Sequence, residues 1–255
     1  MRLHTIEPLE KTGLVNTFFT TKEDTHWKQG TPKMAENYET LAANFGLTTK
    51  EVVGVYQTHT SNIKIVTKAN GGETILRPEE QTGFDGMITN EPGLLLCTKQ
   101  ADCVPVYLLD PEQKAIAMIH SGWKGTAGKI SVNGVKLMEE TYGSKPEHIL
   151  AALGPCICGD CYEVSDDLIE PFSVNFSKDQ IEQIFLPGKK EGKYYLNLPL
   201  AIRLSLQEAG LKNENIFDPP FCTLHSKESD GRWAFPSYRR DHDDIERMLT
   251  GILLK

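Results

Sequence analysis

Short apolar runs separated by turn residues recur along the 255 residues of this chain. Runs of four to eight apolar residues between turn signals are typical of buried strands. This pattern predicts strands at residues 15–21, 51–58, 63–67, 93–98, 104–110, 115–120, 148–154, 193–198 and 215–224. Apolar residues at helical spacing predict helices at 34–46, 126–143, 165–176, 198–210 and 241–253.

The order of these elements indicates the fold class, because strands outnumber helices and do not alternate with them strictly. Three expected strands follow one another between residues 93 and 120, and the DPEQK segment (110–114) suits a hairpin turn. The sequence therefore predicts an α+β fold, in which helices pack on a mixed, largely antiparallel β-sheet core. No long linker or internal repeat divides the chain, so we expect a single domain over residues 1–255.

Composition and charge exclude several classes of protein. The hydrophobic content of 39% and the charged content of 24% are ordinary for a soluble globular protein. No apolar run approaches the roughly 18 residues of a membrane span, and the N-terminus lacks the apolar region of a signal peptide. The net charge of −8 argues against nucleic-acid binding as the main function. Six cysteines without a secretory signal indicate reduced thiols, and we expect a cytoplasmic protein.

Three side chains that can bind a metal stand at the ends of expected strands: His59, Cys103 and His120. Two imidazoles and one thiolate, with a fourth position left to water, match an open catalytic zinc site. Spacing alone leaves two other interpretations open. Cys103 can be a buried core residue, or it can be a nucleophile with His120 as its base, as in a cysteine hydrolase.

Five segments narrow these alternatives. They are YQTHTSNI, FDGMITNEPGLLLCTKQADCVPVYLLD, IHSGWKGT, ALGPCICGDCYEV and FPSYRRD, in that order from about residue 50 to residue 241. In these motifs and in their order, the chain resembles the laccase-domain family of bacterial purine nucleoside phosphorylases, also called the multicopper polyphenol oxidase-like family. The resemblance covers roughly three-quarters of the chain.

The resemblance implies that His59, Cys103 and His120 bind zinc. It also implies phosphorolysis of purine nucleosides (adenosine, inosine and methylthioadenosine) and hydrolytic deamination of adenosine. The expected partners are therefore purine nucleosides and phosphate, with no nucleic acid and no membrane, and the sequence does not indicate an oligomeric state. Relatives have also been credited with copper-dependent phenol oxidation. A multicopper oxidase needs many more His ligands than a chain with seven His residues provides, so we favour zinc over copper.

Other polar residues of these segments are candidates for substrate binding and proton transfer. The candidate contacts to phosphate or ribose are Gln57, Lys124, Arg239 and Arg240. Lys124 stands where the family commonly has Arg, so it offers a point charge rather than a planar fork. Asp102 and Glu163 are the candidate catalytic carboxylates. Where the family has Arg-x-Gly-Gly after its first strand, this chain has Lys22 and no Gly pair, so we assign no substrate contact there.

A further cluster, C-x-C-x2-C, is formed by Cys156, Cys158 and Cys161. Such a cluster invites a second metal or a redox-active thiol pair. No fourth thiol lies nearby in the sequence, and the family does not require all three. We therefore expect a Gly-Pro turn that carries incidental cysteines.

Overall fold

The computed structural model describes residues 1–24, 27, 32–72, 82–242 and 246–255. The helices of this part are α1 (Glu7–Glu10), α2 (Pro32–Asn44), α4 (Trp123–Ala127), α5 (Ile130–Tyr142), α6 (Ile169–Ser173), α7 (Lys178–Ile184), α8 (Leu198–Glu208) and α9 (Tyr238–Asp241). The strands are β1 (Val15–Phe19), β2 (Val52–Gly54), β3 (Ile63–Ile65), β4 (Gly86–Thr89), β5 (Leu95–Gln100), β6 (Val104–Asp110), β7 (Ala115–Ser121), β8 (Leu150–Leu153), β9 (Glu163–Ser165), β10 (Phe185–Pro187), β11 (Lys193–Leu196), β12 (Ile216–Phe217) and β13 (Met248–Leu254).

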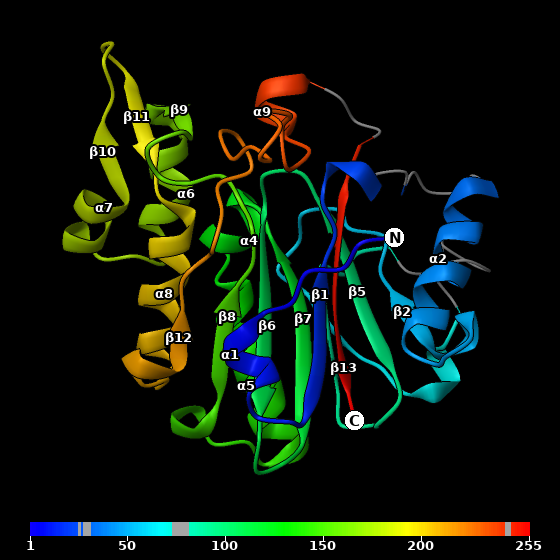
Figure 1. Ribbon diagram of the computed structural model, residues 1–255. Helices are drawn as coiled ribbons and strands as arrows, with labels where there is room; N and C mark the ends of the chain where they lie inside the picture. Colours follow the sequence, from blue (N-terminus) through cyan, green and yellow to red (C-terminus); the bar gives the residue numbers. More distant parts are fainter. Residues whose placement is uncertain (25–26, 28–31, 73–81, 243–245) are drawn as a thin grey trace.

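Two large sheets pack against each other in the middle of the molecule (Figure 1). The larger one has the strand order β12-β8-β6-β7-β4-β3, and the smaller one has the order β1-β13-β5-β2. The core between them joins Phe19 and Ile252 of the smaller sheet to Tyr107 and Met118 of the larger sheet. These apolar side chains are at most 2% exposed, so both sheets bury their facing sides.

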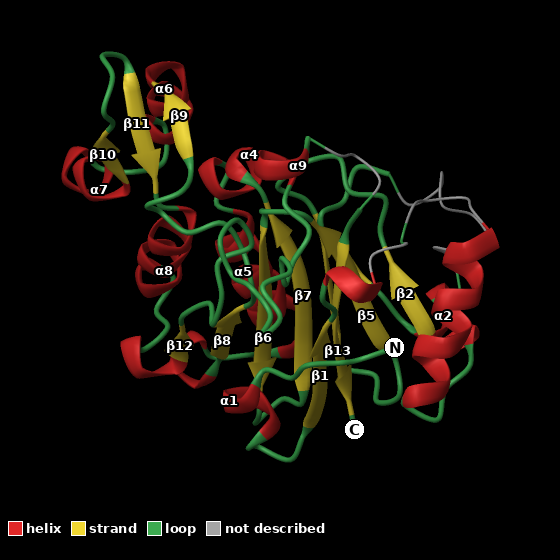
Figure 2. Cartoon of the chain, turned by 45° about the horizontal axis from the view of Figure 1, so that its top comes forward, coloured by secondary structure: helices red, strands yellow, loops and turns green. Residues whose placement is uncertain are grey.

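Helices cover the outer faces of both sheets (Figure 2). The larger sheet packs against α5 and α8, which contribute Val135 and Ile202 to one shared core. The smaller sheet packs against α2, whose Leu41 meets Leu95 and Leu249 of that sheet. A third sheet, with the order β10-β11-β9, stands beside α6 and α7 at one corner of the molecule. Helices therefore enclose a strand-rich centre, as expected for an α+β fold.

The predicted fold class is confirmed, since seven of the strand pairings in the described part are antiparallel and three are parallel. The hairpin at 110–114 is also confirmed. Strands β6 and β7 pair in antiparallel fashion on either side of it. The Asp110 carboxylate accepts hydrogen bonds from the backbone N–H groups of Glu112 (2.9 Å) and Gln113 (3.1 Å), which closes the turn.

The predicted helix at 241–253 is wrong. Helix α9 ends at Asp241, residues 243–245 lie outside the described part, and Met248–Leu254 forms β13 between β1 and β5. All seven residues of β13 are buried, so the strand lacks the alternation of a half-exposed strand. A short apolar run of this kind does not distinguish a buried strand from a buried helix.

Several other predicted boundaries also shift. The helix expected at 126–143 is interrupted after α4, because Lys129 has a φ of +58° and cannot continue the helical backbone. In the helix expected at 165–176, the first residue is the last residue of β9, and α6 covers only Ile169–Ser173. In the strand expected at 215–224, only Ile216–Phe217 is a strand. The strands at 93–120 are divided, because β5 belongs to the smaller sheet while β6 and β7 belong to the larger one. No helix among the described residues has the length and apolar character needed to cross a bilayer.

Candidate metal centre

Three chain segments bring the expected ligands together at one end of the sheets. His120 is the next-to-last residue of β7. Cys103 directly precedes β6, which pairs with β7 in antiparallel fashion. The register pairs Val104 with Ser121, which sets Cys103 beside Gly122. His59 lies on the loop between β2 and β3 and has a left-handed backbone, with a φ of +62°. The hairpin fixes two of the ligands, and the loop adds the third.

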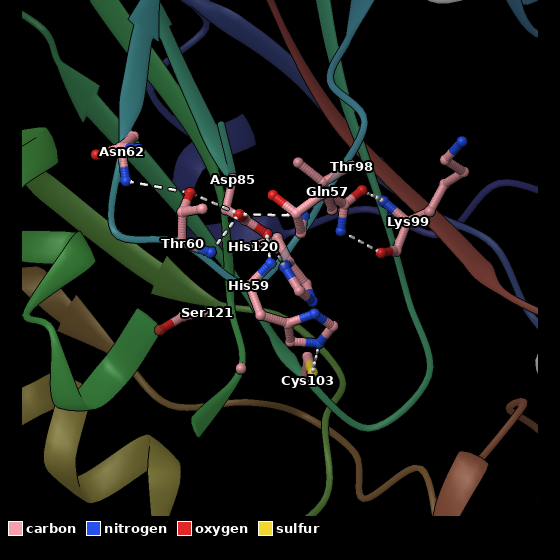
Figure 3. Close-up of polar contacts among 12 residues, drawn as sticks. Gln57, His59, Thr60, Asn62, Asp85, Thr98, Lys99, Cys103, His120 and Ser121 are labelled. Carbon is pink, nitrogen blue, oxygen red and sulfur yellow. Dashed lines mark hydrogen bonds and ion pairs between the residues drawn. The ribbon is translucent and has the colours of Figure 1, made fainter. Parts of the chain in front are cut away.

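The three side chains converge closely enough to share one ion (Figure 3). One ligand atom from each lies within 4.8 Å of the others, and the Cys103 Sγ is 3.9 Å from the His59 Nε2. Gly122 makes this convergence possible: a Cβ there would lie 2.9 Å from His59 Cδ2 and 3.0 Å from Cys103 Sγ. A larger residue at this position would therefore force the His59 ring or the Cys103 thiol to shift.

Asp85 orients two of the three expected ligands, His59 and His120, through hydrogen bonds. This fully buried carboxylate accepts hydrogen bonds from the His120 Nδ1 (2.9 Å) and from the backbone N–H of His59 (3.0 Å). It also accepts from the Thr60 N–H and hydroxyl, at 2.6 and 2.8 Å. Burial opposes ionisation of Asp85, but the hydrogen bond and charge of His120 hold its pKa below the usual value. With Nδ1 engaged in this way, His120 presents Nε2 to the centre, as metal-binding imidazoles do.

Cys103 and His120 perturb each other strongly. Burial favours the neutral thiol, yet the charge and hydrogen bonds of His120, followed by those of His59, lower the pKa of Cys103 to about 6. Burial likewise disfavours the imidazolium of His120, but Cys103 and Asp85 raise its pKa to about 9. The surroundings of Cys103 therefore favour the thiolate, which is the form that binds metals or attacks as a nucleophile.

The three expected ligands line a cavity of about 670 Å³. Its walls carry aromatic side chains from widely separated segments: Trp27, Tyr56, Trp123, Tyr162 and Tyr238. They also carry three cationic side chains, those of Lys99, Arg239 and Arg247. The cavity is large enough for a small organic ligand and combines stacking surfaces with positive charge.

Of the expected catalytic carboxylates, Asp102 lines this cavity, whereas Glu163 is not among its lining residues. Asp102 is 7% exposed and has a φ of +81°. Its carboxylate accepts hydrogen bonds from the hydroxyls of Thr223 (2.6 Å) and Ser237 (3.1 Å) and from the backbone N–H of Arg239 (2.7 Å). It therefore joins the segment before Cys103 to two distant loops.

The four expected substrate-binding residues divide into two pairs. Gln57 and Arg239 line the cavity, although the Gln57 amide is paired with the backbone of Lys99. The Arg239 guanidinium stacks 4.8 Å from the centre of the Tyr162 ring. Lys124 and Arg240 are not among the lining residues. Lys124 is exposed, and Arg240 forms a forked ion pair with the adjacent Asp241.

Sequence reasoning did not single out Asp85, Lys99 or Arg247. Asp85 stands in the FDG segment immediately before β4, and only its place in a motif shared with the family distinguishes it from other acidic residues. Lys99 directly follows the strand expected at 93–98, and Arg247 lies within the helix expected at 241–253. Their role in the cavity wall depends on the pairing of β5 with β13, which a single sequence does not reveal.

Comparison with known proteins gives a consistent result. Residues 17–255 match the family model described as multi-copper polyphenol oxidoreductase laccase. The purine nucleoside phosphorylase YlmD of Bacillus subtilis is 33% identical over 230 residues, covering 87% of this chain and 77% of that protein. The adenosine deaminase RL5 of an unknown prokaryotic organism is 32% identical over 218 residues, covering 85% and 80% of the two chains.

Solved structures show the same fold. The crystal structure of the Bacillus licheniformis hypothetical protein YfiH superposes with a TM-score of 0.87 at 32% identity, covering 99% of this chain and 96% of that one. YlmD of Geobacillus stearothermophilus gives a TM-score of 0.82 at 28% identity, covering 94% and 92%. The chain therefore belongs to the multi-copper polyphenol oxidoreductase laccase family.

Proposed function

We propose that this chain is a zinc-dependent purine nucleoside phosphorylase that also deaminates adenosine. One observation carries the proposal: His59, Cys103 and His120 converge at the edge of a cavity whose walls are aromatic and cationic. The names of two relatives, a purine nucleoside phosphorylase and an adenosine deaminase, support both activities. The substrates proposed are adenosine, inosine and methylthioadenosine, with phosphate as the second substrate of phosphorolysis.

The donor set fits zinc. Two imidazoles and one thiolate would bind zinc through three protein ligands and leave one coordination position for water or substrate, as in catalytic zinc sites. When bound, zinc supplies Lewis acidity and lowers the pKa of water at the open position. Asp85 keeps the His120 Nε2 directed at the centre, and Gly122 leaves room for the His59 ring.

The cavity walls match the two substrates. Aromatic faces such as those of Trp123 and Tyr162 suit stacking on a purine base. Lys99, Arg239 and Arg247 supply the positive charge that phosphate requires. Asp102, the one carboxylate among the lining residues that the structure describes, already accepts three hydrogen bonds. Since Asp102 lines the cavity and Glu163 does not, we assign proton transfer to Asp102.

The proposal is tested on purified protein by elemental analysis and by two assays on the same sample. Inosine with phosphate should give hypoxanthine, and adenosine without phosphate should give inosine. Removal of the metal by a chelator should abolish both activities, and zinc should restore both. Full turnover of inosine by metal-free protein would contradict the proposal.

The lowered pKa of Cys103 beside a raised pKa of His120 favours one alternative, a cysteine hydrolase. A thiolate–imidazolium dyad does not need His59, whereas the metal centre does. His59→Ala changes an exposed residue, so the fold should tolerate it. Retention of activity in this variant, together with rapid alkylation of Cys103 by iodoacetamide, would favour the dyad. Elemental analysis also separates zinc from copper.

Phosphorolysis should fall at alkaline pH because of Lys99. Burial lowers the pKa of Lys99 to about 8. The charge of Cys97 opposes this shift, and the charge of Arg247 adds to it. The ammonium that attracts phosphate is therefore present below pH 8 and lost above it. We expect kcat/KM for phosphate, measured at saturating inosine, to fall about tenfold per pH unit above pH 8.

A guanidinium stays charged throughout this range, so Lys99→Arg should remove the alkaline fall. Lys136→Arg serves as the matched control, because Lys136 is exposed on α5 and is not among the cavity residues. It should retain the fall of the parent protein. An unchanged alkaline limb in Lys99→Arg would assign that limb to another group.

A further inference from the structure

A second cluster of metal-binding side chains lies outside the cavity lining. It consists of Cys158, Cys161, Cys222 and His225, and one ligand atom from each lies within 4.8 Å of all the others. The Cys161 Sγ is 3.3 Å from the His225 Nδ1. In a tetrahedral zinc site with Zn–S bonds of about 2.3 Å, ligand atoms stand about 3.8 Å apart. The four side chains therefore already approach the spacing that zinc imposes.

The cluster combines two short motifs that are 64 residues apart in the sequence, C-x2-C (158–161) and C-x2-H (222–225). Each motif forms a tight turn. The Cys161 N–H donates to the Cys158 carbonyl (3.0 Å), and the Ser226 N–H donates to the Cys222 carbonyl (3.0 Å). Each turn aims its two ligands to one side, as in structural zinc sites built from paired short motifs.

Backbone hydrogen bonds hold the two turns side by side. The loop after β8 and the loop after β12 meet at an isolated parallel bridge between Cys156 and Cys222. The Thr223 N–H donates to the Cys156 carbonyl at 2.9 Å, and the Cys158 N–H points at the Cys222 Sγ at 3.4 Å. A backbone N–H directed at a ligand sulfur stabilises a thiolate there.

Arg240 fixes the second motif from the other side. Its guanidinium donates to the carbonyls of Thr223 (3.2 Å) and Leu224 (3.1 Å), the two residues between the ligands Cys222 and His225. The turn is thus held in place independently of an ion. This also gives Arg240, which we expected to contact substrate, a different position: it braces the second cluster rather than the cavity.

We propose that Cys158, Cys161, Cys222 and His225 hold a structural zinc ion, independent of the ion at His59, Cys103 and His120. Three thiolates and one imidazole complete a tetrahedron and leave no position for substrate. Incidental cysteines were expected because no fourth ligand is close in the sequence, and the fold brings two ligands from the segment after β12. Cys156, the first cysteine of the C-x-C-x2-C pattern, is not a member of the group.

The site would connect a loop of the cavity wall to the loop that carries Thr223. Ile157 and Tyr162, which flank the C-x2-C motif, both line the cavity. The Ile157 N–H donates to the Asp102 carbonyl (3.0 Å), and the Thr223 hydroxyl donates to the Asp102 carboxylate (2.6 Å). Asp102 directly precedes Cys103. An ion at the second cluster therefore braces the segment that carries a ligand of the first.

Zinc stoichiometry tests the proposal on the purified holoprotein. We expect two zinc ions per chain in the parent protein and one in each of two variants, His59→Ala and the double variant Cys158→Ser/Cys161→Ser. The combined variant should contain none. Cys156→Ala is the matched control and should keep both ions. The double variant should also lose about 10 °C in Tm, as expected when a tightly bound structural ligand is removed.

Two further measurements keep the test decisive if the double variant does not fold. His225→Ala changes an exposed ligand and should also lose one zinc ion. In the parent protein, Cys158 and Cys161 should resist iodoacetamide until a chelator is added. One zinc ion per chain, lost completely in His59→Ala, would overturn the second site while leaving the proposed function intact. A disulfide between Cys158 and Cys161 in the intact mass would overturn it equally.

Discussion

His120→Asn should release one zinc ion per chain and lower both phosphorolysis and deamination by at least about 10³-fold. Metal ions contribute several kcal/mol to transition-state stabilisation, and each 1.4 kcal/mol corresponds to a factor of about ten in rate. Asn is preferred to Ala because its side-chain amide can replace the Nδ1 donor, so the Asp85 oxygen that His120 shares with the His59 N–H keeps both of its hydrogen bonds. The change then removes only the Nε2 that faces the centre.

His148→Asn provides the matched control. His148 is also a histidine whose Nδ1 lies next to a carboxylate, at 2.8 Å from Glu112, but it lies in the turn before β8 and is not a cavity residue. This variant should keep its zinc content and both activities. Zinc content by elemental analysis and initial rates with inosine and adenosine are measured together. Unchanged zinc and unchanged rates in His120→Asn would falsify the assignment of His120 as a ligand.

The fold class was predictable because most elements carry local signals. The β6–β7 hairpin is the best example: two fully buried apolar runs flank a turn whose Asp110 binds the N–H groups that follow it. The segment Met248–Leu254 was not predictable from local signals. It is a central strand, defined by its pairing with β1 and β5, and those partners lie far away in the sequence. Tertiary pairing therefore decided its structure.

The three proposed ligands of the first centre could be chosen from the sequence because each ends or precedes an apolar run, and strand ends meet at a sheet edge. The groups that support them could not. Asp85 acts through a histidine and a backbone N–H supplied by two other segments, so nothing adjacent to it in the sequence indicates its burial. The second cluster was not predicted for the same reason. Its C-x2-C motif was visible in the sequence, but Cys222 and His225 come from a loop that only the fold brings near.

Asp85→Asn should weaken zinc binding at the first centre by about 10- to 100-fold, the usual effect of removing a carboxylate that supports a ligating histidine. One oxygen of Asp85 accepts hydrogen bonds from His59 and His120, and the other accepts from Thr60. In either orientation of an Asn amide, its NH₂ group faces one of these donors and leaves it unpaired. The free energy of unfolding should therefore also fall, by about 1–3 kcal/mol.

Asp110→Asn serves as the matched control. Asp110 is an equally buried carboxylate that accepts backbone N–H bonds, but it closes the β6–β7 turn at the opposite end of these strands from Cys103. It should keep the zinc affinity of the parent protein, and because both N–H groups bond to one oxygen of Asp110, an Asn amide oxygen can keep both hydrogen bonds. Affinity is measured by competition with a chelator, and stability by denaturant unfolding of the same samples. If Asp85→Asn loses stability but binds zinc as tightly as Asp110→Asn does, Asp85 supports the fold and not the ligands. If excess zinc restores the rate of Asp85→Asn, the carboxylate acts by holding His120 and His59 in position for the ion.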